Sequence, residues 1–298
     1  MKYQRLRFLA FFSSFLFAVN VAPAQESTTP ASFDWQKAKG TVVDPVACLD
    51  DATQSYALYL PSKYSPDRAW PILYAFDPMA RGKVAVEVYQ QAAEKYGYIV
   101  VGSNNSKNGP ASIQTSATQA MWRDTHLRFA IDKNRVYATG LSGGARAATA
   151  FALYCYTCSV AGVISHGAGY PQGYGKTNPK AANETFAYYA AIGEADFNYP
   201  EIMLLRREKE RQEAAFKVKI YPGPHQWAPP NIAEDAIEWL EIKAMQSGVE
   251  KTDPAFVQTI LEKTKAEATQ AEQNHDTLRE YYALRSILKD FQGLADVT

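Results

Sequence analysis

A serine with glycines two positions to either side stands in residues 140–144, Gly-Leu-Ser-Gly-Gly. Strand-forming residues precede this segment and an alanine-rich run follows it, so Ser142 is expected on a sharp strand-to-helix turn. Such a turn, the nucleophile elbow of the G-x-S-x-G pattern, presents the serine hydroxyl above the sheet edge. Glycines flank the serine because strand and helix cross too closely there to accommodate a Cβ. The pattern therefore predicts that Ser142 is a nucleophile.

A base must take the proton of the serine hydroxyl as it attacks, because the hydroxyl is a weak nucleophile at neutral pH. His225 stands in the Gly- and Pro-rich segment 222–227, between an expected strand and an expected helix. We therefore expect His225 to be the base. His166 also follows an expected strand and stays a rival, whereas His126 falls within an expected helix and His275 within the C-terminal tail.

A third group must hold the base in the right tautomer and orientation. Asp196 follows the expected strand 187–192 and is the acid that we predict for this role. Glu194 is two residues closer to the strand and stays an alternative. The predicted order along the chain is nucleophile, acid and base, which is typical of architectures with a nucleophile elbow.

Strand and helix patterns alternate along most of the chain. The expected strands span residues 54–60, 69–76, 98–103, 136–139, 160–165, 187–192 and 216–221, and the expected helices span 85–96, 117–131, the stretch from the elbow to about 156, and 231–245. The alternation predicts an α/β fold with a mostly parallel sheet and helices on both faces, because each parallel return needs a crossover long enough for a helix. The ligand site of such a sheet lies outside the carboxyl ends of its strands.

The first 24 residues have the features of a secretory signal peptide. Three basic residues stand near its start, residues 8–21 are mostly apolar, and Ala-Pro-Ala at 22–24 is a small-residue cleavage pattern. The apolar stretch is short for a bilayer span, although an uncleaved anchor stays an alternative. We expect a secreted or periplasmic protein with a mobile segment at residues 25–41.

The expected mature chain carries little net charge. Removal of residues 1–24 leaves 28 basic and 31 acidic residues, a net charge of about −3. This balance argues against nucleic-acid binding, and we expect no stable membrane insertion after cleavage. The sequence contains no metal-ligand spacing and no phosphate-binding glycine loop, so neither a metal nor another cofactor is implied.

Three cysteines, Cys48, Cys155 and Cys158, leave one unpaired in any intramolecular scheme. A reactive C-x-x-C pair depends on a helix N-terminus, whereas Cys155 and Cys158 are expected at the far end of the helix that follows Ser142. We therefore expect buried cysteines or one disulfide, from Cys48 to either Cys155 or Cys158.

Residues 54–245 resemble an α/β-hydrolase fold serine esterase, similar to secreted feruloyl or acetyl esterases and polyhydroxyalkanoate depolymerases. The matching segments are Ser55-Tyr56-Ala57-Leu58-Tyr59-Leu60-Pro61, the elbow with Arg135-Val136-Tyr137 before it, the acid after Ala191-Ile192-Gly193, and His225-Gln226-Trp227. The resemblance implies an α/β-hydrolase domain at 42–248 that cleaves carboxylic esters through an acyl-enzyme intermediate. Residues 249–298 are expected to form a C-terminal helical hairpin.

One loop departs from the family pattern. Where members usually carry a His-Gly pair, this chain has Asp77-Pro78-Met79. The oxyanion of the tetrahedral intermediate needs two donors. Gly143 offers one backbone N–H directly after the nucleophile. Pro78 has no N–H, so we expect Met79 to supply the second donor.

Substrate contacts are expected from Asn104 and Asn105, whose amides can bond sugar hydroxyls or ester carbonyls, and from Trp227 beside the predicted base. The expected substrate is a small-molecule or polysaccharide-linked ester. Two alternatives stay open. One is a non-catalytic binding module on an esterase scaffold, which the unusual loop at Asp77 and Pro78 would mark, and the other is a peptidase or lactonase that uses the same three residues.

Overall fold

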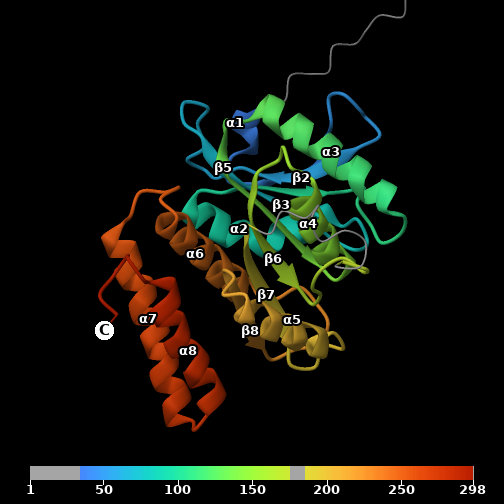
Figure 1. The fold of residues 1–298 in the computed structure, drawn as a ribbon. Helices are drawn as coiled ribbons and strands as arrows, with labels where there is room; N and C mark the ends of the chain where they lie inside the picture. The colour runs from blue at the N-terminus through green and yellow to red at the C-terminus, as the bar shows by residue number, and fades with distance from the viewer. Residues whose placement is uncertain (1–33, 175–184, 298) are drawn as a thin grey trace, which may run out of the picture. The chain divides into compact units, whose positions relative to one another are not determined.

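The computed structural model describes residues 34–174 and 185–297. The predicted signal peptide at 1–24 and most of the predicted mobile segment at 25–41 lie outside these ranges. Within them the chain forms an eight-stranded sheet with helices packed against it (Figure 1).

The sheet is mostly parallel, as predicted. Its strand order is β1-β2-β4-β3-β5-β6-β7-β8. At one edge β1 (Val42–Ala47) and β2 (Ser55–Tyr59) pair antiparallel, and β2 pairs antiparallel with β4. The strands that run parallel to one another are β3 (Trp70–Phe76), β4 (Ile99–Ser103), β5 (Ile131–Leu141), β6 (Val160–His166), β7 (Ala187–Gly193) and β8 (Phe216–Tyr221).

Helices cover both faces of the sheet, as predicted (Figure 1). One face carries α2 (Gly82–Tyr96) and α6 (Pro230–Gln246), and the other carries α3 (Ala111–Arg128), α4 (Gly143–Tyr154) and α5 (Tyr199–Arg211). Under α2 and α6 lies an apolar cluster that includes Tyr89, Tyr137 and Trp239. Burial of this apolar surface is the main force that holds helices on a sheet.

Three described elements were not predicted from the sequence: β1, α5 and the short helix α1 (Trp35–Ala38). β1 carries Asp44 and Pro45 at an irregularity in its pairing with β2, so its sequence does not alternate like a strand. α5 is dominated by charged residues and has Ile202 as its fully buried apolar side chain. α1 lies in the segment that was predicted to be mobile, and its Trp35 ring contacts Tyr64 edge to face.

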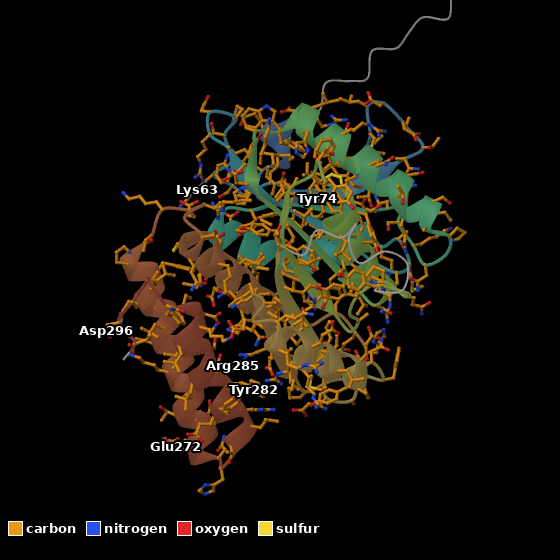
Figure 2. The ribbon with its side chains drawn as sticks, viewed as in Figure 1. Lys63, Tyr74, Glu272, Tyr282, Arg285 and Asp296 are labelled. Carbon is orange, nitrogen blue, oxygen red and sulfur yellow. A yellow bond between two sulfur atoms is a disulfide. The ribbon has the colours of Figure 1, made fainter. Side chains whose placement is uncertain are left out.

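The predicted C-terminal helical hairpin is present. It consists of α7 (Pro254–Gln273) and α8 (Thr277–Asp290), and it packs on α6 through a cluster of buried apolar side chains. Figure 2 shows Tyr282 and Arg285 on α8, where Arg285 forms an ion pair of 2.8 Å with Glu210 of α5. None of the helices in the described ranges is long and apolar enough to cross a membrane.

The predicted disulfide from Cys48 is wrong. Cys155 and Cys158 pair with each other, and their Cα atoms lie 5.4 Å apart, which is within the ordinary range for a disulfide. Cys48 is a free thiol in the core, where burial raises its pKa to about 12. Its thiol is therefore protonated and unreactive near neutral pH.

Candidate active site

Ser142 lies on the tight turn between β5 and α4, with φ 54° and ψ −119°. A non-glycine residue at positive φ is strained and occurs where surrounding structure enforces it. A Cβ on Gly140 would lie 2.2 Å from the Gly144 backbone, and a Cβ on Gly144 would lie 2.0 Å from the Phe76 carbonyl oxygen. The two flanking glycines are therefore required by close backbone approach, as the elbow pattern predicts.

His225 and Asp196 form a hydrogen-bonded pair. His225 Nδ1 lies 2.8 Å from Asp196 Oδ2, and the other carboxylate oxygen accepts the backbone N–H of Asn198 at 2.8 Å. The Asp196 side chain is fully buried, whereas 19% of the His225 side chain is exposed. This pairing leaves the second ring nitrogen of His225, Nε2, free to face a substrate.

The segment His166-Gly167 places the pair beside the elbow. The Ser142 N–H donates to the His166 carbonyl oxygen at 2.8 Å. A Cβ on Gly167 would lie 2.7 Å from Asp196 Oδ2 and 2.9 Å from His225 Nδ1. In the described part of the chain no hydrogen bond joins the Ser142 hydroxyl to His225. Such bonds are often long in unliganded enzymes and tighten when substrate binds.

His166, the rival base, is instead a buried part of the framework. Burial lowers its pKa to about 3, so the ring is neutral at ordinary pH. Its Nδ1 accepts the backbone N–H of Ala228 at 3.3 Å, which leaves the proton on Nε2, 2.6 Å from the Tyr89 hydroxyl. With both ring nitrogens engaged in the core, His166 ties the loop that carries His225 to β6.

Asp77 organises the loop after β3. This fully buried carboxylate accepts the Met79 N–H at 2.8 Å, two hydrogen bonds from Arg81 at 2.9 Å each, and the Trp227 indole N–H at 2.9 Å. Burial alone would raise the pKa of Asp77, but the hydrogen bonds from Arg81, Trp227 and Met79 outweigh burial and lower it. Asp77 therefore stays ionised and joins the loop after β3 to the loop that carries His225.

The predicted oxyanion donors differ in availability. Gly143 begins α4, where the first backbone N–H groups have no partner within the helix. The Met79 N–H is already taken by Asp77 Oδ1, while its side chain is 68% exposed. Met79 could serve as the second donor only if it exchanged that hydrogen bond for one to the substrate.

The predicted substrate contacts already have partners within the protein. Asn104 donates its amide N–H to Asp44 at 2.7 Å, and Asn105 accepts the Ser55 N–H and donates to the Thr53 carbonyl oxygen. The Trp227 indole N–H is held by Asp77. These bonds hold both amides in place but use only part of their donor and acceptor capacity, so their substrate role stays a prediction.

Two side chains near the site were missed. Phe197 is 73% exposed, and its ring lies 4.2 Å from that of His225, centroid to centroid. The amide of Asn108 occupies the space beside Gly143. Phe197 directly follows the predicted acid in the sequence, and Asn108 lies in the same loop after β4 as Asn104 and Asn105. Their closeness in sequence to predicted site residues was the signal that could have indicated both.

Glu194, the alternative acid, points elsewhere. Its carboxylate lies 2.8 Å from Arg279 of α8, and both side chains are about half exposed. His126 donates its Nδ1–H to the Trp122 carbonyl oxygen at 2.8 Å, and His275 lies in the turn between α7 and α8. Among the described residues, no group of three or more His, Cys, Asp or Glu side chains is arranged to hold a metal ion.

Comparison with solved structures identifies the fold. A ferulic acid esterase superposes with a TM-score of 0.53 at 16% identity, covering 67% of this chain and 97% of that one. The chain has the α/β-hydrolase fold. A mutant feruloyl esterase module from Clostridium thermocellum complexed with sinapinate gives 0.51 at 16% identity, over 65% and 85% of the two chains. Thermogutta terrifontis esterase 2 phosphoramylated by tabun gives 0.50 at 12%, over 67% and 92%.

No family model matches the sequence of this chain, and no curated protein matches it either.

Proposed function

We propose that this α/β-hydrolase is a serine esterase that cleaves carboxylic esters through an acyl-enzyme intermediate. The observation that carries the proposal is the 2.8 Å hydrogen bond between His225 and the buried Asp196. This pair packs against Gly167, and the neighbouring residue His166 accepts the Ser142 N–H through its carbonyl oxygen. The proposal is supported by the place of Ser142, Asp196 and His225 at the carboxyl edge of one sheet, and by their order along the chain, which matches the nucleophile, acid and base order typical of the fold. The solved structures of similar fold include enzymes named as esterases.

In this mechanism Ser142 Oγ attacks the carbonyl carbon of the ester while His225 Nε2 takes the hydroxyl proton. Asp196 holds the Nδ1–H tautomer and stabilises the imidazolium that forms. The Gly143 N–H donates to the oxyanion. The intermediate collapses as His225 returns the proton to the departing alkoxide, and an alcohol leaves. Water then attacks the acyl group on Ser142 with His225 again as base, and a carboxylic acid is released.

The substrate and location follow from the same proposal. Exposed Phe197 and Met79 give the mouth of the site an apolar rim, which favours an ester with an aromatic or alkyl part over a purely polar one. The N-terminal leader favours a secreted or periplasmic enzyme, where such esters on plant or bacterial polymers and small molecules are accessible.

The first test is hydrolysis of p-nitrophenyl acetate, with the p-nitrophenol signal followed from the first turnover. We expect an initial burst equal to the enzyme concentration, and a loss of about 10⁴-fold or more in kcat for Ser142→Ala. Ser116→Ala, on the exposed surface of α3, is the matched control and should keep the wild-type rate. Equal rates for wild type and Ser142→Ala would contradict the proposal and favour the binding module.

A further inference from the structure

The loop after β4 reaches across to the loop after β3, directly above the elbow. The backbone N–H of Asn108 donates to the Pro78 carbonyl oxygen at 2.9 Å, and Lys107 forms an antiparallel bridge with Met79. Two loops that are separate in sequence are therefore fixed together by backbone hydrogen bonds. The position of Asn108 does not depend on its own side chain.

The Asn108 side-chain amide occupies the place that a side chain at position 143 would fill. A Cβ built on Gly143 would lie 1.7 Å from Asn108 Oδ1 and 3.2 Å from Nδ2. Residue 143 must therefore be glycine for the Asn108 amide to lie there. The amide is adjacent to the residue whose backbone N–H is the first oxyanion donor.

The second oxyanion donor expected from the loop after β3 is not available there. Pro78 has no N–H, and the Met79 N–H is bound to the buried Asp77 carboxylate. The Asn108 amide makes no side-chain hydrogen bond within the described ranges. Rotation about its last side-chain bond exchanges Oδ1 and Nδ2 at little cost, since this torsion is roughly two-fold. The NH₂ group can thus turn toward Gly143 when negative charge develops there.

We propose that Asn108 is a catalytic residue whose Nδ2–H, together with the Gly143 N–H, binds the oxyanion of the tetrahedral intermediate. The proposal rests on the proposed esterase function and gives Asn108 the role that the sequence had assigned to Met79. It explains why the loop after β3 can depart from the family pattern and keep its N–H engaged with Asp77. The second donor comes from the neighbouring loop.

The test compares Asn108→Ala and Asn108→Asp with wild type on p-nitrophenyl acetate. Removal of one oxyanion donor typically lowers kcat by about 10²- to 10³-fold, so Asn108→Ala should fall in this range with KM changed less than about threefold. Asn108→Asp keeps the shape of the side chain but replaces the donor by a negative charge. It should be at least as slow as Asn108→Ala. Asn134→Ala, an exposed asparagine at the start of β5, is the control and should match wild type.

Several outcomes would overturn the proposal. If Asn108→Ala stays within about threefold of wild type while Ser142→Ala is inactive, the esterase proposal stands and the Asn108 proposal fails. If Asn108→Asp retains wild-type kcat while Asn108→Ala loses it, the side chain fills space and is not a donor. Thermal unfolding followed by circular dichroism must give the same midpoint for all variants, because the exposed side chain contributes little to stability.

A second measurement, covalent labelling of Ser142, tests the proposal even if the enzyme hydrolyses the chosen ester slowly. A fluorophosphonate probe phosphonylates a nucleophilic serine, and its phosphoryl oxygen needs the same donors. Asn108→Ala should slow the labelling of Ser142, read by mass spectrometry, by at least about tenfold. Absence of labelling at Ser142 in wild type would contradict both proposals, whereas equal labelling rates of wild type and Asn108→Ala would contradict only the second.

Discussion

The carboxyl edge of the sheet and the interface between α6 and the C-terminal hairpin both bury carboxylates, but they use different partners. Asp196 at the edge is bound by the His225 ring and a backbone N–H. Asp235 at the interface lies 3.1 Å from Lys263 and 3.9 Å from Lys219, and also accepts the Tyr189 hydroxyl. Ammonium groups thus compensate the charge of Asp235, whereas Asp196 lacks a permanent cation in the described ranges.

The difference is the one that the proposed function requires between a structural carboxylate, Asp235, and a catalytic one, Asp196. Burial alone would raise the pKa of Asp235, but Lys217, Lys219 and Lys263 outweigh burial and hold it well below its usual range. The Asp235 carboxylate links the sheet, α6 and α7 through its contacts with Tyr189, Lys219 and Lys263. The charge of Asp196 is free to stabilise a proton arriving on His225, which is what a reaction cycle requires.

The substitution Asp196→Asn is expected to have the largest effect of those below, a loss of kcat. The amide keeps the shape of the side chain but favours the wrong tautomer of His225, so kcat for p-nitrophenyl acetate should fall by about 10⁴-fold. The unfolding midpoint should change little. Glu194→Gln tests the alternative acid in the same loop and should leave kcat within about twofold. A larger loss in Glu194→Gln than in Asp196→Asn would reverse the assignment of the acid.

The next effect is on stability. Asp235→Ala leaves the buried Tyr189 hydroxyl without its acceptor and removes one of the two carboxylates that Lys263 contacts, Glu238 remaining at 2.6 Å. Loss of one partner from a buried ion pair costs about 3–5 kcal/mol, and we expect about 2–4 kcal/mol here because the lysines are partly exposed. Urea denaturation measures the change. At urea concentrations below the unfolding transition, kcat should stay at the wild-type value. A loss of kcat of more than about tenfold would show that the hairpin interface and the carboxyl edge of the sheet are not independent.

Two carboxylates at the interface between α6 and the hairpin, Asp235 and Asp290, predict a dependence of stability on pH. Burial opposes ionisation of Asp235 and Asp290, but neighbouring lysines prevail and lower both pKa values in the folded state. The unfolded chain then binds protons at higher pH than the folded one, with an ordinary Asp pKa of about 3.9. Their contribution is complete above that pKa and is lost as pH falls through the folded-state values. Asp235→Asn should therefore lose less stability than wild type between about pH 5 and pH 2.5 in urea titrations, and parallel curves would contradict this.

The sequence predicted what depends on local pattern and on the geometry of parallel sheets. β8 matches the expected strand 216–221 residue for residue. Asp196 and His225 pair beside the His166-Gly167 segment that binds the Ser142 turn, because parallel strands end at one edge. The pattern could not reveal that His166 is buried, because its partners Tyr89 and Ala228 are distant in the chain.

The sequence could not distinguish the asparagines for a similar reason. Asn104, Asn105 and Asn108 belong to one polar loop and are equivalent in composition. They differ only in what folds against them: β1 and the β1–β2 connection for the first two, and the elbow for the third. Such contacts between distant segments carry no local signal. The disulfide is a different case, because Cys155 and Cys158 are only three residues apart and their spacing was visible in the sequence.

The smallest expected effect is on the ion pair that joins the two regions. Arg279 of α8 contacts Glu194, two residues before Asp196, and both side chains are about half exposed. Exposed pairs contribute less than about 1 kcal/mol, so Arg279→Ala should shift the unfolding free energy by at most that amount. The hairpin stays in place because its apolar cluster on α6 is unchanged. If kcat of Arg279→Ala fell more than about threefold, the hairpin would be coupled to the orientation of Asp196, and the two regions would no longer be independent.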